Sequence, residues 1–483
     1  ARAGLAPTIE VGEGPTGLVL DEPRGQLYVL DKFEASISVV SLATELETAR
    51  VRFFDPTPSA IRAGREYFYD AHETSGLGLT ACGACHSDAR TDRLAWDLGD
   101  PAGEMKGLDG LNLGAGLPRI SGDFADFHPM KGPMLTQTLQ GIVGNEPFHW
   151  RGDRLTLAEF NPFFESLLGD DEQLDAAALQ ELEDFLATIH FPPNPFRTLQ
   201  NALPTSLPLA GHFTPGRFAP PGQPLPDGNA LHGRALFASP ALECIHCHTL
   251  PTGHGPQAVW NGSAFDFIPR GPSGEGHVAL HPPLFLLEQT MKIPSLRNLY
   301  ERVGFDGTVP SSKAGFGFRH DGAIDSLARF LARPIFPVAS DQDVADMAAF
   351  LLCVSGGIEA EGTTTYVFEP PGTDSLSTHA AVGRQVTFDG SANPAGSALL
   401  AALLAEAAQG DLGLVAHGRI AGLPRAFHRL ASGRFQADRR LERFTLNALL
   451  ASASPAAPLT YTAVPPGSER RIGGDRDSDG ALD

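Results

Sequence analysis

Two short stretches of the chain share one spacing of cysteine and histidine, and this spacing constrains the fold more than any other feature. One reads Cys82-Gly83-Ala84-Cys85-His86 and the other Cys244-Ile245-His246-Cys247-His248. C-x-x-C-H is the attachment signature of a c-type haem: the two thiols bond the porphyrin and the histidine ligates the iron. A zinc half-site or a disulfide is the alternative for a single motif. The two copies predict two covalently bound haem c groups, held by Cys82, Cys85 and His86 and by Cys244, Cys247 and His248.

Size and charge limit the classes of function. The chain has 483 residues and a net charge of −21, which makes nucleic acid a poor partner. It has no run of about 18 apolar residues, so we expect no membrane span. Covalent haem attachment implies a periplasmic or extracellular protein, and the first residues lack a secretion signal, so we expect a mature or trimmed chain. The fifth cysteine, Cys353, lies beside an apolar run and is expected to be a buried thiol without a chemical role.

The N-terminal 52 residues contain four β-like runs separated by turn residues, which predict a four-stranded antiparallel sheet. The runs are 8–11, 16–21, 26–31 and 36–40. A Gly-Pro-x-Gly-Leu segment at 14–18 precedes a strand containing Leu27-Tyr28-Val29, and this pattern resembles one blade of the YVTN-type β-propellers. A propeller needs several blades. We therefore expect either that the chain is part of a longer propeller-containing protein or that the lone sheet packs on its neighbour.

The following region contains two versions of one plan. Residues 64–70 and 233–239 precede the two haem motifs, 132–139 parallels 293–299, 148–153 parallels 318–322, and each half closes with an amphipathic helix. The fold class predicted is a mainly α haem core of two cytochrome c-like domains with flanking β structure. Its parts are a propeller-blade-like sheet (1–52), a first haem domain (53–200), a Pro-rich linker (201–224), a second haem domain (225–357) and a small, β-rich α+β C-terminal appendage (358–483).

The chain closes with an aspartate-rich segment. Oxygen donors at relative positions 1, 3, 5 and 9 are Asp475, Asp477, Asp479 and Asp483, and Gly480 stands at position 6, as in the first part of a calcium loop. The glutamate that normally follows at position 12 has no counterpart in this sequence. The segment predicts a calcium site, with a solvated acidic tail as the alternative.

The order of the motifs resembles the bacterial di-haem cytochrome c peroxidases over residues 55–355. The resemblance depends on the two haem motifs, on Trp150-Arg151-Gly152, on Pro294-Ser295-Leu296-Arg297-Asn298 and on His320-Asp321-Gly322. Relatives of that family include the di-haem enzyme that matures methylamine dehydrogenase and the rubber oxygenases. The resemblance implies that peroxide reacts at the first haem and that the second haem stores or relays electrons.

The same resemblance implies roles for individual residues. Trp150 would lie between the haems and carry electrons, with an ordinary core indole as the alternative. His128 is the candidate removable ligand of the first iron; His149 competes with it, and a histidine hydrogen-bonded to a propionate is the alternative for both. Glu165 is the candidate acid/base group, with Glu159 as its competitor.

The second iron lacks the family's methionine ligand, because residues 326–333 contain none. His320 is our preferred substitute, although a role in positioning other groups fits it equally well. Met347 and a histidine of 277–281 are further alternatives, and an open position is another. The absence of the methionine argues against a high-potential Met/His haem.

Two functions follow from these observations. The first is a peroxidase-like di-haem oxidoreductase that reduces hydrogen peroxide, or uses peroxide or dioxygen to oxidise a substrate, with a small cytochrome or cupredoxin as electron carrier. The second is a non-catalytic electron-transfer protein within a larger extracellular assembly. A third hypothesis is that the flanking β modules bind a partner protein or a polymer and so anchor the haem domains to it.

Overall fold

The computed structural model describes residues 8–99, 102, 104–105, 130, 132–142, 148–152, 154, 156–242, 244, 248, 250, 253, 258–260, 265–267, 280–281, 291–303, 317–355, 378–420, 422–475 and 480–482. The chain divides into two compact units. The first unit comprises Ala1–Ala84, Asn161–Thr188 and Asp475–Asp483, and the second comprises Cys85–Phe160 and Ile189–Gly474. The boundary therefore falls inside the first haem motif.

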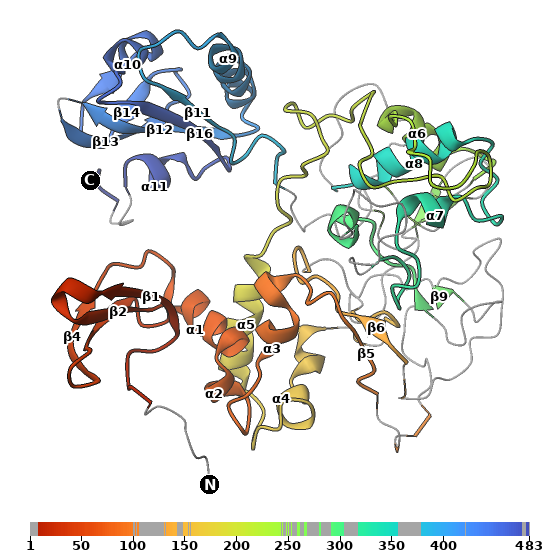
Figure 1. Cartoon of the computed structure of the whole chain (residues 1–483), viewed down its shortest axis with the longest axis horizontal. Helices are drawn as coiled ribbons and strands as arrows, with labels where there is room; N and C mark the ends of the chain where they lie inside the picture. Colours follow the sequence, from red (N-terminus) through yellow and green to blue (C-terminus); the bar gives the residue numbers. More distant parts are fainter. Residues whose placement is uncertain are drawn as a thin grey trace. The chain divides into compact units, whose positions relative to one another are not determined.

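The first unit begins with an antiparallel four-stranded sheet in the order β1-β2-β3-β4 (Figure 1). Asp21 caps the short 3-10 turn between the first two strands, and Gly25 ends this turn in the left-handed conformation. Strands β1 to β3 match three of the predicted runs, whose β-branched and aromatic residues lie between turn residues. The predicted run 8–11 is not a strand, and the fourth strand is β4 instead, because its pairing with β3 rather than a local apolar pattern makes it extended. The bounds of the four strands are β1 (Pro15–Asp21), β2 (Gln26–Asp31), β3 (Ser36–Ser41) and β4 (Leu46–Arg52), with η1 (Glu22–Arg24) between β1 and β2.

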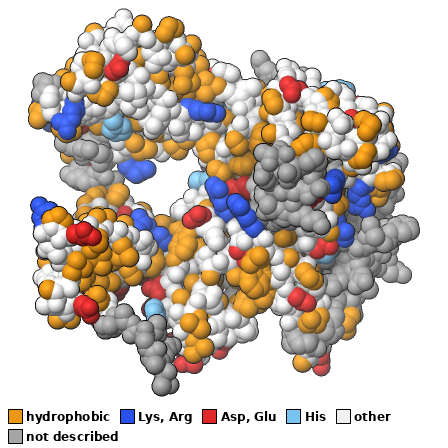
Figure 2. Space-filling view, in the orientation of Figure 1, with side chains coloured by type: hydrophobic (Ala, Val, Ile, Leu, Met, Phe, Trp, Pro, Cys, Tyr) orange, Lys and Arg blue, Asp and Glu red, His pale blue; other side chains and the backbone are white. Residues whose placement is uncertain are grey.

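Apolar side chains reach the surface from both faces of this sheet. Leu18, Val19 and Leu20 are consecutive and all exposed, and successive residues of a strand point to opposite faces. In Figure 2, hydrophobic side chains gather over this sheet, at the lower left. A sheet that is apolar on both faces is typical of strands covered on both sides.

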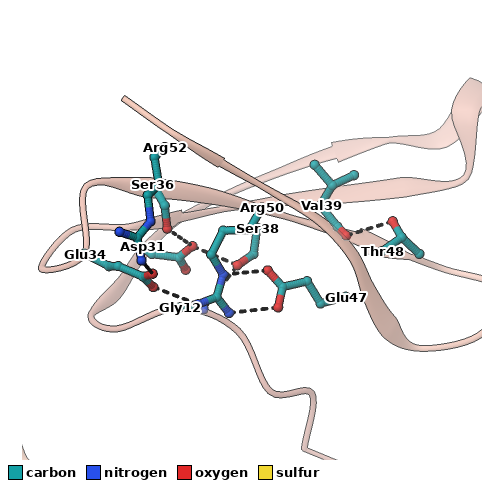
Figure 3. Close-up of polar contacts among 10 residues, drawn as sticks. All are labelled: Gly12, Asp31, Glu34, Ser36, Ser38, Val39, Glu47, Thr48, Arg50 and Arg52. Carbon is teal, nitrogen blue, oxygen red and sulfur yellow. Dashed lines mark hydrogen bonds and ion pairs between the residues drawn. The ribbon is translucent and has the colours of Figure 1, made fainter. Parts of the chain in front are cut away.

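A polar network stabilises the same sheet (Figure 3). The carboxylate of Asp31 is fully buried, and its Oδ2 accepts hydrogen bonds from the hydroxyls of Ser36 (3.0 Å) and Ser38 (2.8 Å). Arg50 forms a bidentate pair with Glu47 and contacts Glu34 at 2.8 Å. These bonds join the end of β2 to β3, and the turn after β2 to β4.

Two helices of the first unit pack closely against each other. They are α1 (Ser59–Tyr69) and α5 (Ala176–Ala187), and Asp175 caps α5 by accepting from the amides of Ala177 and Ala178. A Cβ atom at Gly64 would collide with the carbonyl oxygen of Glu181, so glycine permits the close crossing. The remaining helices of this unit are single turns: α2 (Ala71–Thr74), α3 (Cys82–Cys85) and α4 (Phe163–Ser166).

The second unit repeats this helix crossing. Helix α6 (Ala230–Phe237) packs on α8 (Asp341–Leu352), and a Cβ atom at Gly233 would collide with the carbonyl oxygen of Asp346. Ser340 caps α8 through the amide of Asp343. Helix α8 is buried along most of its length and forms the centre of an apolar core that also contains α7 (Leu327–Leu331).

Short strand pairs and 3-10 turns also occur among the described residues of the two halves, 53–200 and 225–357. The strand pairs are β5 (Ala95–Trp96) with β6 (Met134–Leu135), β7 (Ala258–Trp260) with β8 (Phe265–Phe267), and β9 (Leu280–His281) with β10 (Met291–Lys292). The turns are η2 (Ser87–Ala89), η3 (Leu157–Phe160) and η5 (Leu299–Arg302).

The Pro-rich segment 201–224 packs against the second haem half. Leu203 and Leu209 belong to the core around α8. The guanidinium of Arg217 donates to three carbonyl oxygens just after α7, those of Ala332, Arg333 and Phe336. The segment has irregular backbone but fixed contacts.

The C-terminal part of the second unit is a six-stranded antiparallel sheet with helices. Its strand order is β11-β16-β12-β13-β14-β15, so the last strand of the chain lies inside the sheet (Figure 1). The core between sheet and helices contains fully buried Phe427, Phe435 and Tyr461. The strands are β11 (Gln385–Phe388), β12 (Gly413–Ile420), β13 (Leu423–Arg429), β14 (Phe435–Ala437), β15 (Arg443–Phe444) and β16 (Leu459–Val464), and the helices are α9 (Pro394–Gln409), α10 (Leu446–Ser452) and α11 (Glu469–Gly473).

The prediction of a mainly α haem core is wrong. Among the described residues, 29% are helical and 20% lie in strands, which form several antiparallel sheets. The physical reason is the high content of glycine and proline (53 and 40 residues), which breaks the predicted helices into short turns joined by irregular backbone. In the part of the chain that the structure describes, no helix is both long and apolar enough to cross a membrane.

Candidate functional site

The histidines of the two C-x-x-C-H motifs both place Nδ1 on a backbone carbonyl oxygen, although the two carbonyls belong to non-equivalent segments. Nδ1 of His86 lies 2.9 Å from the carbonyl oxygen of Gln137, and Nδ1 of His248 lies 3.0 Å from that of Gly253. A carbonyl oxygen only accepts, so Nδ1 carries the proton and donates, and Nε2 is the nitrogen with a lone pair for a metal. Burial lowers the pKa of both imidazoles below their ordinary value, which favours the neutral form that ligates iron.

The cysteines of the motifs are compatible with thioether attachment. Cys82 and Cys85 stand at the two ends of the single turn α3, directly before His86, and are thiols rather than a disulfide. Burial, and then the charge of Asp92, raise the pKa of the Cys85 thiol. Cys244 is also a thiol, and Cys247 lies outside the described residues. Two thiols beside an imidazole held through Nδ1 fit a covalently bound haem.

The two halves match in their backbone as well as in their motifs. His149 and Arg319 share a left-handed conformation (φ 65° and 69°), and each directly precedes the residue at the equivalent position, Trp150 and His320 respectively. The amide of Leu135 donates to the carbonyl of His320 (2.7 Å), and the amide of Lys292 donates to the carbonyl of Trp150 (2.8 Å).

This reciprocity fixes the register of the repeat. Trp150 and His320 are equivalent, and each accepts a hydrogen bond from the opposite half, so their donors Lys292 and Leu135 are equivalent too. The sequence pattern instead pairs Leu135 with Leu296, which lies four residues after Lys292. Gly141 and Asn298 agree with the structural register, since each lies six residues further on and each has a left-handed φ (55° and 60°). The predicted pairing of 132–139 with 293–299 is therefore corrected, because a shared Pro-x-Leu pattern misled the alignment.

Trp150 lies where the two halves meet within the second unit. Its indole is 6% exposed, and Nε1 donates to the carbonyl oxygen of Leu135 at 2.8 Å. The ring of His320 stands edge to face with it at 6.5 Å between centroids. The guanidinium of Arg302 lies 5.0 Å above the indole ring. Trp150 thus contacts residues of both halves: Leu135 and Met134 of the first, and Arg302 and His320 of the second.

His320 is a partly buried imidazole in a cationic neighbourhood. Burial lowers its pKa, the charge of Asp321 opposes this, and the charges of Arg319 and Arg151 add to it. Its neutral form is therefore favoured, as a metal ligand requires. Its contact with Trp150 suits a positioning role equally well, so the two alternatives of the sequence analysis stay open.

The candidate acid/base residues are exposed. Glu165 belongs to α4 in the first unit, and its Oε2 accepts a hydrogen bond from the side chain of Gln173. Glu159, in the second unit, is exposed too. The ring of His149 packs edge to face on Phe160 at 4.8 Å. His128 lies outside the described residues.

Several predicted sites fall partly outside the described residues. Asp475 is buried, while Asp477, Asp479 and Asp483 are not described, so the calcium loop stays a prediction. Met347 is buried in the core of α8, as is Cys353, whose thiol donates to the carbonyl of Phe196. No group of three or more His, Cys, Asp or Glu side chains suited to a metal ion occurs among the described residues.

Arg302 is the residue that sequence reasoning missed. It belongs to none of the motifs, and its place above Trp150 depends on a contact between segments about 150 residues apart. Lys292 was missed for the same reason. The sequence matches no known family model, and a search of curated proteins found no match to it.

Proposed function

We propose that the protein is a di-haem c-type oxidoreductase of the periplasm or extracellular space. It would take electrons from a small carrier protein and reduce hydrogen peroxide, or use peroxide or dioxygen to oxidise a substrate. The observation that carries the proposal is the matched pair of histidines: both motifs hold the imidazole through Nδ1 on a backbone carbonyl, which leaves Nε2 for iron.

The chain's own residues divide the work. Cys82, Cys85 and His86 would hold one haem, and Cys244, Cys247 and His248 the other. Bound haem supplies an iron that exchanges single electrons and, where its sixth position is open, binds peroxide. Trp150 supplies a polarisable ring where the two halves meet, which suits electron transfer between them.

Haem content is the first test. We expect a pyridine haemochrome spectrum and a mass increase equal to two haems, with the double variants Cys82→Ser/Cys85→Ser and Cys244→Ser/Cys247→Ser each lowering the content by one. A Cys353→Ser variant is the matched control and should retain both, because Cys353 lies outside the motifs. A mass equal to that of the bare polypeptide would contradict the proposal.

Peroxide reactivity is the second test. Stopped-flow spectra of the oxidised and half-reduced protein should change within seconds of adding hydrogen peroxide. Glu165→Gln should slow the change if this carboxylate moves the proton between the peroxide oxygens. An unchanged spectrum in both redox states would exclude the peroxidase function.

The exposed positions of Glu165 and Glu159 favour a second candidate, a non-catalytic electron-transfer protein. A catalytic acid/base group usually lies in a pocket that shields it from water. Electron paramagnetic resonance of the oxidised protein separates the two: a high-spin signal indicates an open iron and supports the enzyme, whereas two low-spin signals support the carrier.

A further inference from the structure

A partly buried guanidinium covers one face of the Trp150 ring. Arg302 donates from Nε to the carbonyl oxygen of Gly317 (3.2 Å) and from an Nη to that of Arg319 (3.0 Å). Both acceptors are neutral, and no carboxylate pairs with Arg302 among the described residues. Burial lowers its pKa to about 10, so the group is still charged at neutral pH. A full positive charge therefore lies 5.0 Å from the centre of the indole ring.

The Nε1 proton of the same ring has no base to accept it. Nε1 of Trp150 donates to the carbonyl oxygen of Leu135, which accepts hydrogen bonds but is not a base. The ring is 6% exposed, so bulk water does not take this role. An indole that lost an electron here would have to stay a radical cation, next to the guanidinium of Arg302.

We propose that Arg302 is a positioning residue that keeps Trp150 neutral and closed-shell, so that the ring conducts electrons without storing the oxidising equivalent. This inference rests on the proposed function. A cation over an aromatic face is attracted to the neutral ring and repelled by a ring that has lost an electron, and the interior's low dielectric strengthens both effects. The hydrogen bonds to the carbonyl oxygens of Gly317 and Arg319 hold the planar guanidinium over the indole ring.

The test oxidises tryptophan without peroxide. Flash-quench oxidation of the full-length holoprotein with a dissolved ruthenium tris(bipyridine) complex generates tryptophan radicals, and transient absorption measures their yield. The Trp150→Phe variant gives the radical yield at Trp96 and Trp260 alone. Subtracting this yield from that of each other protein gives the yield of the radical at Trp150. We expect this difference to be at least about fivefold larger in Arg302→Gln than in the wild type, because the repulsive charge is gone.

Two further variants separate charge from structure. Arg302→Lys keeps the charge, so its yield of the Trp150 radical should stay near that of the wild type. If lost packing alone were the cause, the yield would rise equally in Arg302→Lys and Arg302→Gln. Arg90→Gln removes a partly exposed arginine that pairs with Glu301 at 3.2 Å, and should change nothing. If Arg302→Gln fails to fold, Arg302→Met fills the same space without charge and replaces it.

Equal Trp150-dependent yields in the wild type and the uncharged variant would overturn the inference. The oxidant is external, so this result does not depend on peroxide chemistry. If the protein binds haem but does not react with peroxide, the proposed function is contradicted. The radical yields still decide whether the charge of Arg302 acts on Trp150.

Discussion

Single side chains decide what the junction between the two haem halves does. Trp150 belongs to the first half in sequence, but its backbone carbonyl and its ring also contact residues of the second half: Lys292, Arg302 and His320. Its own half holds it through the carbonyl oxygen of Leu135, which accepts from Nε1, and through apolar packing with Leu135 and Met134. An indole fixed in this way has a defined orientation, which electron transfer through a ring requires.

The Trp150 hydrogen bond gives a prediction about stability. Trp150→Phe keeps an aromatic ring under Arg302 but leaves the carbonyl of Leu135 without its indole donor, and we expect a loss of about 1–3 kcal/mol in the free energy of unfolding. Urea unfolding followed by circular dichroism measures it. Trp96→Phe, at an exposed position, is the control and should cost far less. An equal loss in both variants would contradict the role assigned to the buried bond.

At the scale of elements, the duplication appears most clearly in the helix crossings. Helices α1 and α5 in one half, and α6 and α8 in the other, meet at Gly64 and Gly233. The aromatic contacts follow the same plan, with Phe68 on Phe185 and Phe237 on Phe350. The described residues of each half thus contain one close-packed helix pair with equivalent glycine and phenylalanine contacts.

Alanine at either glycine tests this packing. In an exposed helix the change from glycine to alanine stabilises by about 1 kcal/mol, but here the new methyl group meets a backbone carbonyl. We expect Gly64→Ala and Gly233→Ala each to destabilise by about 1–3 kcal/mol, as overpacking does. Gln180→Ala, on the exposed side of α5, is the control. Thermal unfolding that shows a gain in stability for either glycine variant would refute the close crossing.

The N-terminal sheet gives a prediction about pH. The hydrogen bond from Arg50 lowers the pKa of Glu47 below its ordinary value of 4.5, so this pair stabilises the folded state above that pH, and the contribution is lost as the pH falls through the folded pKa. Unfolding of the wild type and Glu47→Gln, compared from pH 7 to pH 3, should show a difference that disappears at the acid end. A difference that is constant with pH would mean that the charge of Glu47 contributes nothing.

On the scale of the whole molecule, the net charge of −21 is the property most relevant to a partner. A surface with this charge attracts a cationic electron carrier and repels an anionic one, and salt screens both effects. The charge therefore bears on the rate of encounter rather than on the fold.

Salt dependence of electron transfer checks this. The rate of reduction by a basic cytochrome should fall about tenfold or more between 10 mM and 200 mM salt, since steering weakens with screening. An acidic carrier should show the opposite trend or none. Equal salt dependence for both carriers would indicate that the charge serves solubility alone.

The sequence by itself determined the features that depend on local chemistry. The C-x-x-C-H spacing and the β-like runs of strands β1 to β3 are properties of a few adjacent residues, so they are readable without a fold. Haem attachment follows from such a spacing and is still a prediction to be tested. The short helices in the haem halves were not readable in this way, because helical periodicity alone does not show where irregular backbone interrupts it.

Only the tertiary structure decided what depends on segments far apart. The register of the repeat was set by reciprocal bonds of Leu135 and Lys292, and the charge over Trp150 came from Arg302, in the other half. Local sequence patterns do not reveal these long-range contacts, because the contacts form only when the folded chain brings the two halves together. The sequence thus identified the residues that would hold the haems, and the fold determined what surrounds the path between them.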